Sequence, residues 1–463
     1  MPDHTPGLGR AVTSCRMCGS SDLERYLDLG HTPPADQFRR ADQLDEPSVH
    51  FPLRVVACTA CGLSQLDYVV RPEILYQDEY PYEASTTRAG RLHFRAFAAH
   101  VAKRFGFGEH DLAVDIGSNV GELLAGFRKE GMRVAGIDPA ANIAAIANER
   151  GIPTIADFFG AHSVENVLVD HGQASVITGT NVFAHVDDLD AFMASVQTLL
   201  APNGVFIFEV PYFGNLLRDL EYDTIYHEHL SYVSVRPLVG FFARFGMRIF
   251  DIREQDIHGG SFRIFVDRGE HGPATDALGK FLERERTEGV HDPARLRQFA
   301  ADVRANRAQL ADLLFGLRRR GYRVAGVNAP AKDMTLLNYC HIGSDTLEFV
   351  TEKSRLKIGR YTPGAHIPVV ADEALLANMP DYALLLAWNF ADEIMGNLSE
   401  YRAAGGQFIL PIPSPRIVGQ NRVASLPLSR SRGGVRQQSS VEHEAQEQRG
   451  ETGSTDGDEK VAA

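Results

Sequence analysis

The feature that most constrains this 463-residue chain is the stretch 112–140, LAVDIGSNVGELLAGFRKEGMRVAGIDPA. A short apolar run ends at Asp115, and Gly117 and Gly121 bracket a turn that leads into a helical pattern. A second apolar run then ends at Asp138. This order of strand, glycine turn, helix, strand and acid is typical of half of a nucleotide-binding α/β unit.

The chemistry of the turn indicates which ligand it would bind. It reads D-x-G-x-x-x-G and lacks the G-x-G-x-x-G glycines that hold the pyrophosphate of a dinucleotide at a helix N-terminus. S-adenosylmethionine has no phosphate, and a looser turn followed by an acid suits its ribose, so we expect a site for this methyl donor. Asp138 would bind the ribose and Asp157 the adenine amino group. The residues expected around the donor are Asp115, Gly117, Gly121, Asp138, Asp157 and Asn181. An ordinary α/β sheet whose turns bind nothing is the alternative.

Strands and helices alternate from residue 112 onward, which predicts a parallel sheet with crossover helices. The expected strands are 112–117, 133–138, 153–157, 174–180 and 204–210. Two further β-like runs, 247–254 and 261–267, flank Gly259-Gly260 and predict an antiparallel pair that completes a seven-stranded sheet at its edge. A charged helical stretch, about 275–320, leads to a second α/β unit that begins at 323–327. Residues 1–75 show little regular periodicity.

Four of the five cysteines form two C-x-x-C-G knuckles, Cys15 with Cys18 and Cys58 with Cys61. Two knuckles supply the four thiolates of one tetrahedral Zn²⁺, and four protein ligands leave no open position, so we interpret the zinc as structural. Two disulfides, which a reducing compartment disfavours, or a redox pair are the alternatives. Cys340 stands alone, and we expect it to pack in a core.

Histidine and aromatic residues form a second candidate site. An insertion after the fifth strand contains Tyr226-His227-Glu228-His229, and His185 follows the fourth strand. Beside a methyl donor, a neutral imidazole can accept a proton, because it titrates near pH 6.5. A metal pair or a hydrogen-bonded loop would show the same pattern. Tyr80-Pro81-Tyr82 would form a lid or touch the substrate, or simply pack between domains.

Charge and hydropathy argue against a nucleic-acid-binding, membrane-spanning or secreted protein. The formal net charge of −13 argues against a phosphate-backbone partner. No apolar run reaches the roughly 18 residues of a membrane span, and the N-terminus lacks the apolar core of a signal peptide. We therefore expect a cytoplasmic monomer with no nucleic-acid or membrane partner. Residues 424–463 contain almost no apolar side chains, which predicts a disordered tail.

Several motifs follow one another along the chain. They are the double knuckle, DIGSN (115–119), YHEHLSY (226–232), NAPAK (328–332), KIGRYTPGAHIPV (357–369) and AWNFADEI (387–394). In this set and order, over about residues 12–423, the chain resembles the nucleotide-sugar C-methyltransferases, which make branched deoxysugars for antibiotics. It departs from them at Val120 and Glu352, where relatives often have Asp. The first departure would slightly alter contact to the donor.

The resemblance implies an α/β protein with a class I methyltransferase core. Its implied domains are a zinc-binding domain (12–75), a donor-binding methyltransferase domain (76–305) and a C-terminal Rossmann-like domain that binds the nucleotide sugar (306–423). The implied reaction is methylation at C3 of a TDP-linked 4-keto deoxysugar. The residues implied around the sugar are Tyr80, His185, Tyr226, Glu228 and His229, with His229 as the base. Those implied around the nucleotide are Asn328, Lys332, Lys357 and Tyr361.

Four other functions remain as alternatives. One is a methyltransferase of the same fold that acts on another small molecule. A zinc-ribbon methyltransferase acting on RNA is disfavoured by the acidic charge and the HEH motif. A non-catalytic protein that keeps the methyltransferase fold is possible because fold alone does not establish activity. A nicotinamide enzyme built on the second α/β unit is disfavoured because the NAPAK loop lacks the glycine fingerprint.

Overall fold

The first strand of the glycine-turn unit, β6 (Leu112–Ile116), lies inside a seven-stranded sheet of order β12-β13-β10-β9-β6-β7-β8. The computed structural model describes residues 7–76, 88–257 and 259–419 of the chain. The other strands of this sheet are β7 (Arg133–Asp138), β8 (Thr154–Ala156), β9 (Ala174–Thr180), β10 (Leu200–Pro211), β12 (Arg248–Gln255) and β13 (Ser261–Asp267). Strand β13 pairs antiparallel with both β10 and β12, so the predicted closing pair is confirmed.

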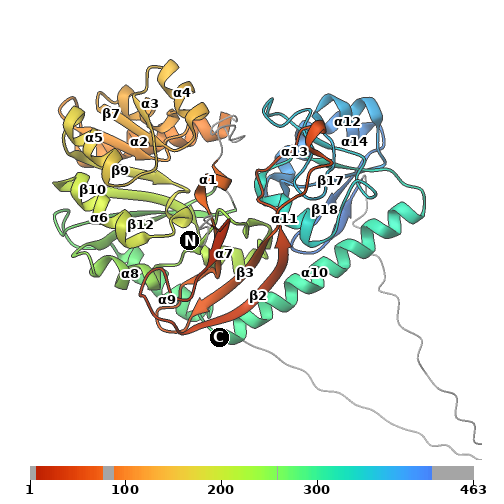
Figure 1. Cartoon of the computed structure of the whole chain (residues 1–463), viewed down its shortest axis with the longest axis horizontal. Coiled ribbons are helices and arrows are strands. Elements are labelled where there is room, and N and C mark those ends of the chain that lie inside the picture. Colours follow the sequence, from red (N-terminus) through yellow and green to blue (C-terminus); the bar gives the residue numbers. More distant parts are fainter. Residues whose placement is uncertain (1–6, 77–87, 258, 420–463) are drawn as a thin grey trace, which may run out of the picture. The chain divides into compact units, whose positions relative to one another are not determined.

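Helices cover both faces of this sheet, because its buried strands present apolar side chains to each side. One face packs against α2 (Arg88–Phe105), α3 (Glu122–Lys129) and α4 (Ala141–Glu149), which lie together in Figure 1. The other face packs against α5 (Ala161–His171), α6 (Leu189–Leu199), α8 (Val235–Ala243) and α9 (Asp276–Thr287). The predicted α/β fold with a class I methyltransferase core is therefore confirmed.

The N-terminal module (residues 7–76) contains more regular structure than its sequence predicts. Strands β2 (Leu23–Thr32), β3 (Phe51–Cys58) and β4 (Ser64–Leu66) form an antiparallel sheet whose fourth strand, β11 (Ser231–Tyr232), comes from the insertion after β10. A smaller sheet pairs β1 (Gly9–Ala11) with β5 (Tyr68–Val70), and α1 (Pro72–Leu75) follows. Because β11 begins two residues after His229 of the YHEH motif, the N-terminal module contacts the segment that carries the candidate acceptor site.

The insertion itself (residues 212–247) begins with α7 (Phe213–Asp219) and the short helix η3 (Tyr222–Thr224). After β13, the predicted helical stretch consists of two helices, α9 and the 27-residue α10 (Pro293–Arg319). Figure 1 shows α10 as one long helix. Asp292 caps α10 and Pro293 occupies its first turn, where a missing N–H costs nothing. The predicted domain boundary at 305/306 lies inside this helix.

The C-terminal part is a second doubly wound unit with sheet order β16-β15-β14-β17-β18-β19. Its strands are β14 (Val324–Val327), β15 (Val350–Glu352), β16 (Val369–Ala371), β17 (Tyr382–Leu385), β18 (Gln407–Leu410) and β19 (Arg416–Val418). Its helices are α11 (Ala331–Tyr339), α12 (Glu373–Asn378), α13 (Ala391–Asn397) and α14 (Ser399–Ala403). If these strands are numbered 1 to 6 along the chain, their order across the sheet is 3-2-1-4-5-6, as in dinucleotide-binding folds. Ligands bind such sheets at the carboxyl ends of the strands, beside the first and fourth strands.

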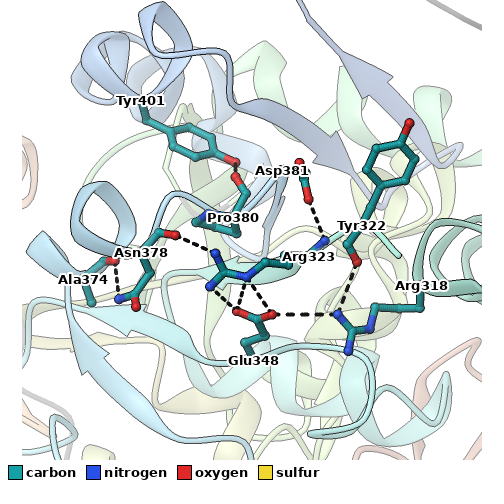
Figure 2. A network of polar contacts seen from close by, with 9 residues as sticks. All are labelled: Arg318, Tyr322, Arg323, Glu348, Ala374, Asn378, Pro380, Asp381 and Tyr401. Atoms are coloured by element: carbon teal, nitrogen blue, oxygen red, sulfur yellow. Dashed lines mark hydrogen bonds and ion pairs between the residues drawn. The ribbon is translucent and has the colours of Figure 1, made fainter. Parts of the chain in front are cut away.

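Arg323 holds the opposite, amino end of this second sheet. Its guanidinium donates to both carboxylate oxygens of Glu348 and to the carbonyl of Asn378, and its backbone N–H donates to Asp381 (Figure 2). These groups precede β14, β15 and β17, or end α12, so they fix the strand starts and leave the carboxyl ends open to a ligand.

Two smaller expectations concern burial and membranes. Cys340 is 2% exposed, as predicted for a core residue. Across the described ranges, no helix combines the length and apolar character needed to cross a membrane. The predicted tail, 424–463, lies outside the described residues.

Candidate functional site

The carboxyl ends of the parallel strands in the two larger sheets contribute to one cavity of about 1530 Å³. Loops of the methyltransferase sheet, the insertion, the C-terminal unit and part of the N-terminal module all line it. The predicted site residues that line it are Asp115, Gly117, Asp138, Asn181, His185, Tyr226, Glu228, His229, Asn328, Lys332 and Lys357. Tyr80 lies outside the described residues.

The donor half of the cavity is organised by the turn after β6. Gly117 has a φ of +64°, and a Cβ there would lie 2.5 Å from Cγ2 of Val182, so only glycine fits. The turn presents the backbone N–H of Asn119 to Oδ2 of Asp138 at 2.9 Å, and the N–H of Ala140 donates to Oδ1 at 3.0 Å. Burial raises the pKa of Asp138, while these two N–H groups favour its charged form. A fixed carboxylate at this point suits a ribose diol.

Polar atoms around the same turn still have hydrogen-bonding capacity. Asp115 accepts a bond from Thr178 Oγ1 at 2.6 Å, and burial raises the pKa of its carboxyl to about 7. The side-chain oxygens of Thr180 and Asn181 are buried and have no hydrogen-bond partner among the described residues. Buried polar atoms normally have partners, so these atoms fit a polar ligand such as S-adenosylmethionine.

Three predicted site residues do not line the cavity, and each has a local reason. Asp157 binds His162 Nδ1 at 2.8 Å and the N–H of Phe158 at 2.8 Å, so its carboxylate is already engaged. Gly121 has a φ of +78° and its Cα faces the side chain of Ile152, so it shapes the helix start. Tyr361 forms an isolated bridge to Arg39 through two backbone hydrogen bonds of 2.7 and 2.9 Å.

His229 lies in the other half of the cavity, the candidate acceptor half. Its Nδ1 lies 2.7 Å from the carbonyl oxygen of Thr224. A carbonyl only accepts, so Nδ1 carries the hydrogen in the neutral ring and the lone pair is on Nε2. The ring packs 4.1 Å from that of Tyr226 and 5.0 Å from that of His185, centroid to centroid.

His185 is paired with an aromatic residue that the sequence does not single out. The hydroxyl of Tyr76 lies 3.2 Å from Nδ1 of His185, and both residues line the cavity. Burial, with a smaller contribution from His229, holds the pKa of His185 well below its ordinary value, so the ring is neutral. Burial also raises the pKa of Tyr76 well above its ordinary value. A protonated Tyr76 that donates to Nδ1 leaves an N–H on Nε2 of His185. The sequence signal that could have identified Tyr76 is its place in the tyrosine-rich segment YQDEYPY.

The two histidines of the HEH motif have different environments. His227 is 1% exposed, and its Nε2 lies 3.3 Å from the carbonyl of Phe51 in the N-terminal module. Burial lowers the pKa of His227 to about 4. Glu228 is buried and lines the cavity together with His229. The motif therefore places one histidine between domains and the other in the site.

The C-terminal unit contributes two lysines, the half-buried Lys332 and the buried Lys357, that are each paired with an acid. Lys332 Nζ lies 3.4 Å from Oδ2 of Asp223 and 2.8 Å from Asn389, and Trp388 Nε1 donates to the same Asp223 oxygen at 2.7 Å. Lys357 Nζ donates to the carbonyl of Ala329 at 2.9 Å.

Asp36 of the N-terminal module lies 3.7 Å from the Lys357 ammonium. Neither Asp36 nor Asp223 is predicted from the sequence, because each of these ion pairs joins segments that are far apart in the chain. Asn328, the first residue after β14, has a φ of +69°. Its side-chain oxygen is buried and has no hydrogen-bond partner among the described residues.

The four cysteines of the knuckles form the predicted cluster. Their sulfur atoms lie within 4.8 Å of one another, and the Cys15–Cys61 and Cys18–Cys58 pairs are each 3.5 Å apart. Zinc–thiolate bonds of about 2.3 Å in a tetrahedron place sulfur atoms roughly 3.8 Å apart, so the cluster fits one Zn²⁺. Gly19 and Gly62 follow the knuckles with φ of +73° and +93°, a backbone conformation that glycine adopts readily.

Comparison with known proteins assigns the family. Family models match over most of the chain: a domain described as zinc binding (15–76), a methyltransferase domain (91–251) and a C-methyltransferase C-terminal domain (256–413). The C-methyltransferase NovU of Streptomyces niveus is 38% identical over 411 residues, which cover 88% of this chain and 97% of NovU. The chain belongs to the C-methyltransferase family. It is an S-adenosylmethionine-dependent enzyme with a zinc-binding domain.

Solved structures with partial similarity include two methyltransferases. One is an S-adenosylmethionine-dependent methyltransferase from Clostridium acetobutylicum, with 12% identity, coverage of 38% of this chain and 91% of that one, and a TM-score of 0.32. The other is magnesium protoporphyrin IX methyltransferase from Synechocystis, with 12% identity, coverage of 38% and 79%, and a TM-score of 0.30.

The cysteine cluster predicts the metal content of this C-methyltransferase. Native mass spectrometry should show about one zinc per chain, and Cys18→Ser should lose most of it because three thiolates bind less tightly. Cys340→Ser is the matched control, since this buried cysteine is outside the cluster. Wild-type protein without zinc, or equal zinc loss in both variants, would contradict the assignment.

Asp138→Ala tests the donor half. The variant should bind S-adenosylmethionine roughly 10- to 100-fold more weakly in calorimetry, because hydrogen bonds to a charged group contribute about 1.5–3 kcal/mol. Asp157→Ala should bind it with unchanged affinity, since Asp157 does not line the cavity. Weakening by Asp157→Ala in place of Asp138→Ala would reverse this assignment.

Proposed function

We propose that this enzyme methylates C3 of a TDP-linked 4-keto deoxysugar through an enolate, and that the product is a branched deoxysugar for an antibiotic. The observation that carries the proposal is the hydrogen bond from His229 Nδ1 to the Thr224 carbonyl. It leaves the basic nitrogen, Nε2, on a ring that lines a cavity shared by the donor turn and the C-terminal unit. The resemblance to nucleotide-sugar C-methyltransferases and the similarity to NovU support the substrate class.

The chemistry requires a carbon acid. A C–H bond next to a ketone can lose its proton because the carbonyl oxygen takes up the charge. Nε2 of His229 would accept the C3 proton, and the electron pair of the broken C–H bond would form the enolate. S-adenosylmethionine, when bound, supplies an electrophilic methyl group for this carbon.

The neighbours of His229 would stabilise the enolate oxygen. Neutral His185 can present its Nε2–H because the hydroxyl of Tyr76 is positioned to donate to Nδ1. The Tyr226 hydroxyl is the other candidate donor, because its ring packs on that of His229. Fixed donors in a site that excludes water stabilise a developing charge without reorganising.

The nucleotide would bind to the C-terminal unit. After β14, Asn328 lies in the connecting loop and Lys332 in the first turn of α11, and Asn389 follows β17; all three line the cavity. These segments lie at the carboxyl ends of the first and fourth strands of a doubly wound sheet, where such folds bind ligands. A diphosphate would place its negative charge beside Lys332 and the exposed Lys353.

His229→Asn tests the proposed base. With a panel of 4-keto nucleotide sugars, wild-type enzyme should methylate at least one at C3 and exchange the C3 hydrogen with deuterated solvent. The variant should lose both activities by roughly 100- to 10,000-fold, the usual contribution of a general base, and still bind S-adenosylmethionine. His227→Gln is the control in the same motif and should retain the exchange rate per folded molecule. Methylation at oxygen or nitrogen would contradict the proposal.

Fluorescence tests the nucleotide site, because Trp388 is the only tryptophan of the chain. TDP should change its emission, since Lys332 lies 5.2 Å from the indole ring and pairs with the acid that accepts the indole N–H. Lys332→Met should weaken TDP binding by about tenfold or more, as expected for a lost charge-assisted contact. Lys280→Met, on the exposed side of α9, should not. An unchanged TDP affinity in Lys332→Met would exclude this site.

A further inference from the structure

Arg16 is a buried cation inside the first zinc knuckle, between Cys15 and Cys18. Its side chain is 2% exposed. Its backbone N–H donates to Gln65 Oε1 at 2.9 Å, and Gln65 Nε2 donates back to the carbonyl of Ser14 at 3.0 Å. The knuckle and β4 therefore fix the backbone position of Arg16. Burial of its charged side chain costs free energy unless hydrogen bonds and ion pairs compensate.

The guanidinium reaches two loops of the methyltransferase core. Nε lies 3.2 Å from Oδ1 of Asp187. Nη1 donates to the carbonyl of Leu66 at 2.9 Å and contacts the carbonyl of Leu230 at 3.3 Å. Asp187 and Leu230 belong to the loop after β9 and to the insertion, which are far apart in the sequence.

Each of these two loops carries one of the candidate site histidines. Asp187 is two residues after His185, and Leu230 directly follows His229. The N–H of Leu230 donates to the carbonyl of Ala184 at 2.8 Å, which joins the two loops directly. The Leu230 carbonyl accepts from the N–H of Leu66 at 3.0 Å as well as from Arg16. One side chain thus holds the two histidine loops against each other.

We propose that Arg16 is a positioning residue for the methyl-transfer site, which sets the spacing of His185 and His229 from the zinc knuckle. An apolar side chain could fill the same volume, but only a planar guanidinium offers donors to a carboxylate and to two carbonyls at once. The zinc, by fixing the backbone on both sides of Arg16, contributes to the site without contact to substrate. The inference about catalysis depends on the proposed roles of the two histidines, whereas the inference about loop position does not.

Hydrogen–deuterium exchange of Arg16→Met tests the positional part without any acceptor. Peptides that cover 183–187 and 226–232 should exchange faster than in wild type, while peptides of β9 and β6 stay unchanged. Zinc should remain about one per chain, and the dissociation constant of S-adenosylmethionine should stay within about threefold. Unchanged exchange in both loops, or faster exchange throughout the chain, would overturn the proposal.

Kinetics of the same variant test the catalytic part. On the acceptor that wild type uses, kcat should fall roughly 100-fold with little change in KM, since small misplacements of catalytic groups have effects of this size. Arg16→Lys should recover part of the loss, because it can pair with Asp187 but cannot span both carbonyls. Arg10→Met is the control: Arg10 also pairs with Asp187, but its side chain is 62% exposed, so kcat and loop exchange should not change.

The two proposals fail in different ways. If wild type methylates no 4-keto nucleotide sugar, the proposed function is wrong, and the exchange experiment still decides whether Arg16 positions the loops. If wild type is active and Arg16→Met keeps wild-type kcat, Arg16 is not a positioning residue.

Discussion

The carbonyl of Thr224 determines what His229 can do. By accepting from Nδ1, it makes Nε2 the basic nitrogen, and it fixes the ring between Tyr226 and His185. That carbonyl is itself held in a buried segment, since Thr224 donates its hydroxyl to the carbonyl of Glu221 at 2.7 Å. The tautomer of the proposed base therefore depends on the backbone of the insertion and on whatever holds that backbone in place.

The C-terminal unit holds this backbone from the other side. Asp223, the residue before Thr224, is fully buried and accepts from Trp388, while Thr335 of α11 donates to the carbonyl of Ile225 at 2.8 Å. Lys332 also pairs with Asp223, and charges on three nearby acids keep the pKa of this lysine raised although burial opposes them. Lys332 contacts Asp223, and the next residue, Thr224, contacts His229. A change at Lys332 can therefore affect the position of His229. The proposed nucleotide site and the proposed base are therefore connected through the carboxylate of Asp223.

The sequence predicted what depends on local pattern. The seven-stranded sheet, the glycine turn with Asp138 and the cysteine cluster all arise from residues close in the chain or from repeated knuckles, and each is present. The contact of Asp157 with His162 is not predicted from the sequence, because an acid at a strand end looks the same whether it faces a ligand or a neighbouring side chain. Strand β11 was missed because two residues carry no periodicity, and the partner strand is more than 160 residues away in the chain.

The long-range ion pairs could not be predicted from the sequence either, because their partners are far apart in the chain. Asp36 with Lys357 joins the N-terminal module to the C-terminal unit, and the backbone bridge between Arg39 and Tyr361 joins the same two parts. Strand β11 pairs with β4, and His227 contacts the carbonyl of Phe51. The N-terminal module therefore contacts the candidate acceptor side of the site at several points. The turn after β6 and Asp138, by contrast, are held by hydrogen bonds within the methyltransferase core. A disturbance at the zinc cluster should therefore alter the acceptor side first, because that side shares its strands, its carbonyls and its buried charges with the module that the metal folds.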